Sequence, residues 1–229
     1  MIITLDGPSG SGKSTVSHLL ARHFNIPCLD TGAMYRSVAW RALENKIDLD
    51  NEISLVALTQ KLKFKFGFEG ETAFVELTDE AGRKTRLGRE IRTPEVSLAA
   101  SRVAKLKKVR AVLVQQQQEI GMDEGAVVEG RDAGTVIFPK AKYKFYMTAS
   151  DDERARRRHL ELVEKLGSAA PSLADVQREM LQRDHQDSSR VESPLVAAKD
   201  ADKIDTTGLA LEAVVDVIVK KVKKEIRAS

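Results

Sequence analysis

The chain begins with a glycine-rich stretch, LDGPSGSGKST at residues 5–15, and the rest of the architecture can be worked out from it. Gly7 to Ser14 fit the pattern G-x-x-x-x-G-K-[ST]. A short apolar run at residues 2–5 precedes the pattern, as a buried parallel strand would. The residues after it predict a helix over 13–24, whose apolar face contains Val16, Leu19, Leu20 and Phe24. This order indicates a phosphate-binding loop; the alternative is a glycine-rich turn that enters a helix.

A loop of this kind binds the phosphates of ATP or GTP. Its glycines let the backbone N–H groups point inward, and the following helix adds positive potential at its N-terminus. Lys13 is expected to bridge the β- and γ-phosphates, while the Ser14 hydroxyl coordinates Mg²⁺ that is held mostly through ATP.

Length and composition limit the classes of protein that need to be considered. A chain of 229 residues suits one large α/β domain with a small insertion. No apolar run reaches the roughly 18 residues of a membrane span, and no signal peptide is expected. The single cysteine, Cys28, excludes an internal disulfide, so we expect a cytoplasmic protein with Cys28 as a small core residue.

The charge pattern favours a small anionic ligand over nucleic acid. The net charge is +3, since 37 basic residues nearly balance 34 acidic ones. The arginines lie in separate clusters beside carboxylates, without the continuous basic stripe that nucleic-acid binding favours. No sequence pattern indicates a partner chain, and we expect a monomer.

Strands and helices alternate along most of the sequence, which predicts a parallel sheet covered by helices on both faces. The expected strands are 2–5, 27–30, 126–130, 143–149 and 203–206. The expected helices are 13–24, 33–44, 54–62, 94 to about 120, 151–167, about 173–190 and 209–226, the last with Leu211, Val214, Val215 and Ile218 inward. Residues 64–87 differ: they alternate apolar and polar residues, and predict an antiparallel meander broken at Gly67, Gly70 and Gly82.

Two short motifs resemble functional signatures but are set aside. Asn45 to Asp48 read N-K-I-D, the guanine-reading element of GTPases, yet they follow a helix too early in the chain, so a helix end and polar turn are expected. Asp30-Thr31-Gly32 imitates an aspartic-protease motif, but no second copy supplies the paired carboxylate.

Four charged clusters point to phosphate chemistry, although each also has a plain structural explanation. EGRDAG at 129–134 follows a strand, where functional groups of open α/β sheets gather, or is simply a charged loop. Arg183, Asp187 and Arg190 share a helical face, as an exposed ion-pair ladder also would. ERARRR at 153–158 packs four arginines into about one turn, or forms a solvated helix face. The fourth cluster, Tyr35 and Arg36, opens a predicted helix.

Phosphoryl transfer gives the clusters one purpose, because the transferring group spreads negative charge over its oxygens and guanidinium groups bind phosphate bidentately. An arginine-rich segment that closes over ATP would also exclude water, the wasteful alternative acceptor.

Taken in order, these motifs resemble those of the bacterial cytidylate kinases, which are nucleoside monophosphate kinases. The resemblance covers nearly the whole chain and is carried by GPSGSGKST, LDTGAMYR, the β-rich insert, EGRDAGTVIFP, ASDDERARRR, RDHQDSSR and IDTT. It implies a five-stranded parallel sheet in a core of about 1–30, 120–150 and 170–229. It also implies a region that binds the monophosphate, with the insert, at about 31–119, and a helical lid at about 151–167.

The resemblance also implies site residues and substrates. The expected substrates are ATP, with Mg²⁺, and CMP or dCMP, without nucleic acid or membrane. Lys13 and Arg131 are expected to be catalytic, with Arg154, Arg157, Arg158 and Arg190 on the transferring phosphate. The ATP phosphates are assigned to Gly7, Pro8, Ser9, Gly10, Ser11, Gly12, Lys13, Ser14 and Thr15. CMP is assigned to Arg36 and Arg131 at its phosphate, Ser101, Arg110 and Asp132 at cytosine, Arg183 and Asp187 at the sugar, and also Thr31 and Tyr35.

The assignment of Asp132 has a physical basis of its own. The cytosine N4 amino group donates a hydrogen bond that a carboxylate accepts, whereas uracil presents a carbonyl oxygen there. Sites that use such bonds discriminate by roughly 10⁴. We therefore expect a preference for CMP and dCMP over UMP.

The sequence departs from similar proteins in two places. Ser101 and Arg110 are nine residues apart, so one straight helix would point them in opposite directions. Similar proteins often carry a proline between them, where this chain has Lys107 and Lys108; we still predict a break near 105–108. Residues 115–118, QQQQ, lack an arginine often found near position 117, and we expect no site role there.

The expected mechanism is direct in-line transfer of the γ-phosphoryl group of ATP to the CMP phosphate, with Glu129 as a hypothetical support for Mg²⁺-bound water. The nearest rival is a kinase of the same fold for uridylate or for a non-nucleotide acceptor. A GTP-driven switch or a nucleic-acid-binding ATPase is the rival of another class.

Overall fold

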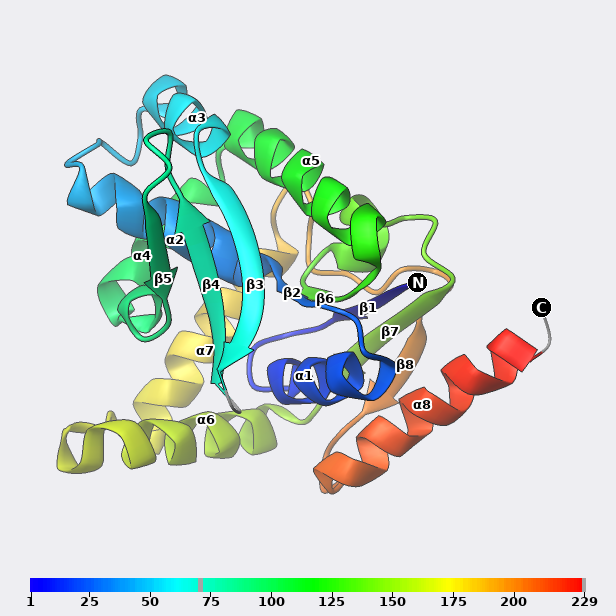
Figure 1. Ribbon diagram of the computed structural model, residues 1–229. Coiled ribbons are helices and arrows are strands. Elements are labelled where there is room, and N and C mark those ends of the chain that lie inside the picture. The colour runs from blue at the N-terminus through cyan, green and yellow to red at the C-terminus, as the bar shows by residue number, and fades with distance from the viewer. Residues whose placement is uncertain (70–71, 228–229) are drawn as a thin grey trace.

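The computed structural model describes residues 1–69 and 72–227, and its core is a five-stranded parallel sheet (Figure 1). The strands are β1 (Ile2–Asp6), β2 (Cys28–Asp30), β6 (Ala126–Gly130), β7 (Tyr143–Thr148) and β8 (Asp202–Asp205), in the order β2-β6-β1-β7-β8. All four pairings are parallel, which confirms the predicted sheet. Because β1 is central, the phosphate loop that follows it lies in the middle of the sheet edge.

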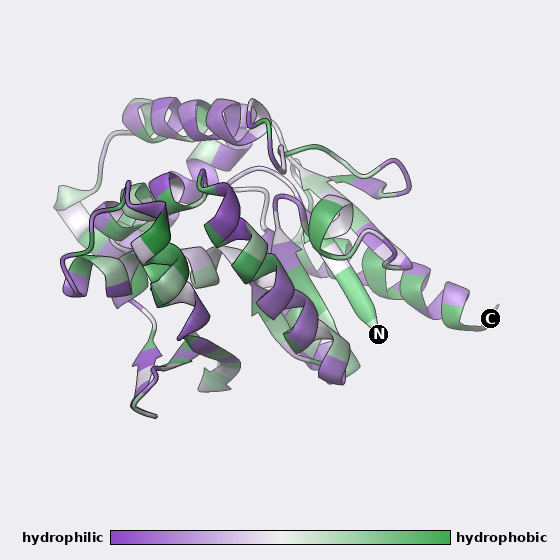
Figure 2. Cartoon of the chain, turned by 90° about the horizontal axis from the view of Figure 1, so that it is seen from above, coloured by the Kyte–Doolittle hydropathy of each residue, from purple (hydrophilic) through white to green (hydrophobic). Residues whose placement is uncertain are grey.

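Strand β6 is apolar on both faces because helices cover the sheet on both sides. In β6, Val127 packs toward one core cluster while Ala126 and Val128 pack toward the other. This alternation follows from the two-residue period of a strand. The first cluster also holds buried Cys28, as predicted. Figure 2 shows the hydrophobic colouring of the central strands against the mixed colouring of the helices.

Two helices, α1 (Lys13–Phe24) and α8 (Leu211–Arg227), cover one face of the sheet. Val214 and Ile218 of α8 are buried there, and Leu211 and Val215 pack partly against the same core, as expected. The other face carries α2 (Thr31–Glu44) and α5 (Lys107–Glu124), with α3 (Glu52–Gln60) and α4 (Pro94–Val103) beyond them. The described residues contain no helix that is long and apolar enough to cross a membrane.

The predicted break in the long helix is present between α4 and α5. The chain leaves helical geometry at Leu106, whose ψ is 111°, and α5 begins at Lys107. The Glu52 side chain, from α3, accepts a hydrogen bond of 2.8 Å from the backbone N–H of Lys108. An acceptor from another helix therefore satisfies the free N–H that the new helix start exposes.

The region 63–87 forms an antiparallel sheet of β3 (Lys63–Glu69), β4 (Thr72–Thr78) and β5 (Lys84–Leu87), as predicted. The predicted break at Gly67 is wrong, because Gly67 lies inside β3 opposite Phe74. A Cβ atom there would lie 2.5 Å from the Phe74 ring, so glycine makes room for the ring to lie across the strand. Gly82 turns the chain between β4 and β5 with φ at 73°, and Gly70 lies outside the described residues.

An aromatic residue near the end of β3, Phe68, contacts α1, the helix that follows the phosphate loop. Phe68 meets His18 of α1 edge to face, with their centroids 5.1 Å apart. The Arg22 guanidinium lies 5.4 Å from the centre of the same ring. The insert therefore touches the core of the protein as well as the α2–α5 region.

Helices α6 (Asp151–Leu166) and α7 (Leu173–Ser188) form an antiparallel hairpin at one end of the molecule (Figure 1). Ser150 caps α6 by accepting the N–H of Glu153, and Gly167 ends it with φ at 58°. Both ends agree with the sequence expectation. The described residues also contain three short turns, η1 (Glu90–Arg92), η2 (Ala133–Ile137) and η3 (Gly167–Ala169).

The N-K-I-D motif occupies a helix end, as expected. Asn45 is the C-cap of α2, and Lys46 turns the chain with a positive φ of 52°.

Candidate active site

The phosphate loop connects β1 to α1 and requires glycine at two close approaches. A Cβ atom at Gly7 would lie 2.0 Å from the carbonyl oxygen of Met147, so no side chain fits. Gly10, with φ at 75°, lies against the α6–α7 hairpin. The positive φ values in this loop allow a turn that L side chains rarely adopt.

Lys13 lies folded within the loop. Its ammonium group donates hydrogen bonds to the Pro8 carbonyl at 2.5 Å and to Ser11 Oγ at 3.2 Å. Burial lowers the pKa of Lys13, and the nearby positive charge of Arg131 lowers it further. An anion beside Lys13 would favour the charged ammonium group and so offset both effects. A bound phosphate would supply such an anion.

A magnesium ion held mainly by a nucleotide fits the residues next to the loop. The Ser14 side chain is exposed at the first turn of α1, and it hydrogen-bonds buried Glu129 at the end of β6. Across residues 1–69 and 72–227, no group of three or more His, Cys, Asp or Glu side chains could hold a metal alone. One hydroxyl beside one carboxylate is typical of Mg²⁺ that keeps its waters and takes phosphate oxygens.

Glu129 and Thr31 join the start of α2 to the end of β6. Thr31 Oγ1 donates to the Glu129 carbonyl at 2.8 Å. Burial raises the pKa of the Glu129 carboxyl group to about 7, and the negative charge of Asp30 adds to this effect.

Arg110 and Asp132 form a buried ion pair at 2.5 Å, where their side chains are 7% and 9% exposed. Arg110 also donates to the Ala104 carbonyl in the α4–α5 break. Its guanidinium lies 5.4 Å from the ring centre of Tyr35, and burial raises the pKa of the Tyr35 hydroxyl. The break therefore places three predicted CMP-binding residues together. Such a pair retains oxygen lone pairs and N–H groups for a polar ring edge.

Ser101 is not joined to this group. Its Oγ donates to the Ser97 carbonyl within α4, at 3.1 Å.

Asp6 holds the backbone directly after Asp132, and the sequence analysis did not identify this residue. Its two carboxylate oxygens accept the backbone N–H groups of Ala133 and Gly134, at 2.8 and 2.7 Å. Burial raises the pKa of Asp6 to about 6 against these donors. The chain then makes a single π-helical turn, Ala133–Ile137, which is a feature often found at functional sites. A carboxylate directly before the glycine loop was the available signal.

Asp187 of α7 gathers two predicted arginines. It accepts from Arg131 Nε at 3.0 Å and from Arg190 at 2.5 Å, with only 4% of its side chain exposed. Arg183 lies on the same side. Loss of hydration lowers the pKa of Arg183 to about 10, and the neighbouring positive charges, that of Arg131 first and then those of Arg36 and Arg190, act in the same direction.

Arg36 pairs with Asp30 at 2.8 Å, and Asp30 also caps α2 by accepting the Ala33 N–H. Burial opposes the charge on Asp30, but Arg36 and then Arg92 hold its pKa below the usual range. The electrostatic contacts of Arg183 and Tyr35 thus link the groups around Arg36, Asp132 and Arg190.

The arginines of α6 divide into two sets. Arg154 is buried and donates to the Ser9 carbonyl of the phosphate loop at 2.9 Å, while Arg157 donates to the Thr206 carbonyl at 2.7 Å and its Nη1 approaches Gly12. Arg158 instead pairs with Glu161 at 2.8 Å and is 39% exposed. The structure therefore brings Arg154 and Arg157 to the loop but not Arg158.

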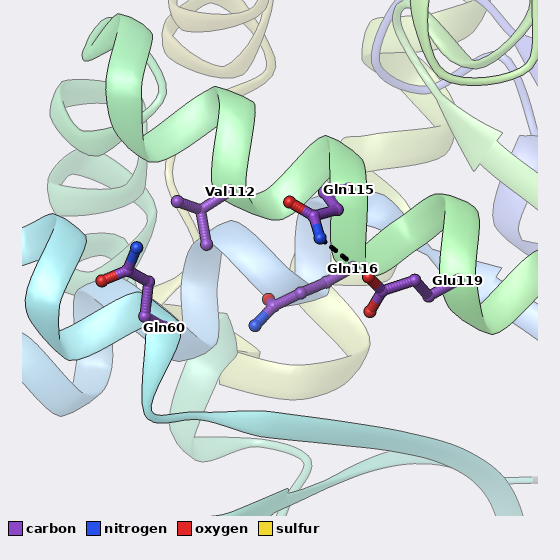
Figure 3. A pocket seen from close by; sticks show the side chains of 5 residues that line it. All are labelled: Gln60, Val112, Gln115, Gln116 and Glu119. Carbon is purple, nitrogen blue, oxygen red and sulfur yellow. Dashed lines mark hydrogen bonds between the residues drawn. The ribbon is translucent and has the colours of Figure 1, made fainter.

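Two surface hollows lie away from these residues. One, of about 480 Å³, is lined by residues such as Arg41, Lys61 and Arg83. The other, of about 280 Å³, lies between α3 and α5 and is shown in Figure 3. It is lined by Gln60, Val112, Gln115, Gln116 and Glu119, and none of these is a predicted site residue.

A phosphate loop after the central strand, facing several arginines and a buried Arg–Asp pair, defines a kinase of the phosphate-loop class that acts on a small anionic acceptor. A family model described as cytidylate kinase matches residues 3–224. A cytidylate kinase of Thermosipho melanesiensis is 45% identical over 226 residues, which are 98% of each chain. One of Clostridioides difficile is 39% identical over 222 residues, which are 97% of this chain and 98% of that protein.

The chain belongs to the cytidylate kinase family, and it is thus a nucleoside monophosphate kinase. Among solved structures, an uncharacterized protein from Eubacterium ventriosum has a TM-score of 0.54 at 15% identity, covering 97% of this chain and 98% of its own. That likeness supports the fold alone.

Proposed function

We propose that this protein transfers the γ-phosphoryl group of ATP to the 5′-phosphate of CMP or dCMP. The observation that carries the proposal is the buried Arg110–Asp132 pair, at the end of the strand next to the phosphate loop. Family membership supports the same reaction.

The proposed mechanism is direct and in line. The acceptor phosphate is mostly dianionic near pH 7, because its second pKa is about 6, so the attack needs no general base. Lys13 and the arginines then position the two phosphates and neutralise the charge that spreads during transfer. No covalent intermediate with the enzyme is required.

The proposed contacts with CMP use the arginines and carboxylates described above. Arg36 and Arg131 bind the acceptor phosphate, Arg183 and Asp187 bind the sugar, and Asp132 accepts the cytosine amino group. Arg110 and Ser101 are also proposed to contact cytosine, and Thr31 and Tyr35 are further proposed CMP-binding residues. The ATP phosphates take the backbone N–H groups between Gly7 and Thr15. Arg190, Arg154 and Arg157 are proposed for the transferring phosphate.

Magnesium bound together with ATP would supply positive charge that offsets the negative charge of the phosphates. Ser14 would hold it, and Glu129 would orient its water.

We also propose that residues 151–167 act as a lid and residues 31–119 as the region that binds the monophosphate. Arg158, now paired with Glu161, would reach the phosphates only after the lid closes. We further propose that the protein acts as a monomer in the cytoplasm on free nucleotides.

An acceptor panel tests the function. ADP release is measured in a coupled assay with ATP and Mg²⁺, using CMP, dCMP, UMP, AMP and shikimate in turn. We expect high kcat/KM for CMP and dCMP only. Similar kcat/KM for UMP would contradict the role of Asp132, and turnover with shikimate alone would contradict the proposed acceptor. The same assay with GTP in place of ATP is the control for the rival GTP-dependent functions.

A further inference from the structure

The α6–α7 hairpin is packed directly on the phosphate loop at Gly10. A Cβ atom at Gly10 would lie 2.8 Å from Met180 Cε and 2.9 Å from the Arg154 carbonyl oxygen. Met180 belongs to the small core of the hairpin, with Ala155 and Val176. The contact leaves no room for a side chain on the loop, so Arg154 at the start of α6 and Met180 of α7 lie directly against Gly10.

Asp184 of α7 closes a set of hydrogen bonds across this contact. Its Oδ1 accepts the Ser9 backbone N–H at 3.3 Å, and its Oδ2 accepts from Arg154 Nη1. The same Nη1 donates to the Ser9 carbonyl at 2.9 Å. Arg154 is 5% exposed and Asp184 is 14% exposed, so solvent competes little for these groups.

Arg154 has a second carboxylate partner of a different kind. Asp151 accepts from Nη2 at 2.5 Å, but it lies one turn earlier in the same helix and is 57% exposed. It moves with Arg154 and cannot fix the guanidinium relative to the loop. Asp184 comes from another helix and touches the loop itself, so it can.

We propose that Asp184 is a positioning residue that aims the Arg154 guanidinium at the ATP phosphates held by the loop. This inference rests on the proposed kinase function and deepens it. A free arginine side chain has many rotamers, and fixing one of them in advance removes that entropic cost from the transfer step. Nη2 of Arg154 carries two N–H groups, and Asp151 accepts from one of them, so the other is left for a phosphate oxygen.

The first test replaces Asp184 with asparagine. Asp184→Asn keeps the shape of the side chain and an oxygen that can accept the Ser9 N–H, but it removes the charge that orients Arg154. We expect kcat to fall at least tenfold, with KM for CMP within threefold of the wild type and Tm little changed. The matched control is Asp151→Asn, which removes the other carboxylate from Arg154 and is expected to keep kcat within twofold.

A double-mutant cycle separates positioning from a general loss of structure. If Asp184 acts through Arg154, then Arg154→Met alone and Arg154→Met with Asp184→Asn have the same kcat within about threefold. Multiplied effects would overturn the proposal, as would an Asp184→Asn variant with wild-type kcat. A fall in kcat that only follows a fall in Tm would also overturn it.

A second readout does not depend on the acceptor. The ³¹P resonance of the γ-phosphate of bound ATP reports the charge next to it, so Asp184→Asn is expected to shift it in the same direction as Arg154→Met. An unshifted resonance in Asp184→Asn overturns the positioning role. If the wild type fails to phosphorylate CMP and dCMP, the proposed acceptor is wrong, and the resonance still decides the role of Asp184.

Discussion

Replacing Asp132 with asparagine should remove much of the preference for cytosine. In the proposed complex the Asp132 carboxylate accepts the N4 amino group, whereas an asparagine amide can also turn its NH₂ toward the uracil O4. A hydrogen bond to a charged group contributes about 1.5–3 kcal/mol. This energy corresponds to a fall of about 10- to 150-fold in kcat/KM for CMP, at about 1.4 kcal/mol per factor of ten. The value for UMP should stay level or rise.

The same substitution should also destabilise the protein, because Arg110 keeps its charge in a buried place. Breaking a buried pair costs about 3–5 kcal/mol, and asparagine retains one acceptor, so the lower end of this range applies. At about 2–4 °C for each kcal/mol in a chain of this size, Tm should fall by roughly 6–12 °C.

The assay compares kcat/KM for CMP and UMP in the wild type and Asp132→Asn, well below either Tm. The control is Arg110→Met combined with Asp132→Leu, which removes the pair and should recover most of the stability but none of the cytosine preference. An Asp132→Asn enzyme that is folded and keeps the wild-type CMP-to-UMP ratio would refute the reasoning.

Three further substitutions test other parts of the structure. Lys13→Ala should lower kcat by about 10²-fold or more, with the Kd for CMP from calorimetry within threefold; near-normal turnover would contradict its role. Gly10→Ala, at a φ of 75° and against the hairpin, should cost about 1–2 kcal/mol more in urea unfolding than Gly82→Ala, where φ is 73° but the space is open; equal costs would argue against the close contact. Hydrogen bonds, first that from Arg156, lower the pKa of Glu153 to about 2 from 4.5, so its pairing stabilises the fold above pH 4.5 and is lost as the pH falls toward 2. The stability difference between the wild type and Glu153→Gln should therefore shrink over that interval, and a constant difference would exclude the pairing.

Local sequence signals predicted the sheet, the phosphate loop and the order of the helices. They succeeded because the apolar periodicity, the glycines and the caps of each element lie within a few neighbouring residues. The break before α5 was expected from the spacing of Ser101 and Arg110, although no proline marks it. Its stabilising contact comes from Glu52, about 56 residues earlier in the chain, and no local pattern reveals that.

The site was predictable in its residue types but not in all of its contacts. The spacing of Arg183, Asp187 and Arg190 indicated a shared face, and Asp187 pairs with Arg190. Asp184 lies about 100° around the same helix and was not singled out, since its contact is with Ser9 of the phosphate loop, 175 residues away. Arg158, by contrast, was predicted as a site residue but pairs with Glu161 at the surface. A dense arginine cluster in the sequence does not reveal which of its side chains turn outward.

The ring of Phe68 has a consequence for how much the insert can vary. Because this side chain rests against His18 and Arg22, the far end of the antiparallel sheet is anchored to the helix that begins at Lys13. Two residues removed from β3 would preserve the strand pairing and its alternation yet withdraw the aromatic anchor by about 7 Å. Any swing of the insert during turnover must therefore either part this aromatic contact or carry the first helix along with it.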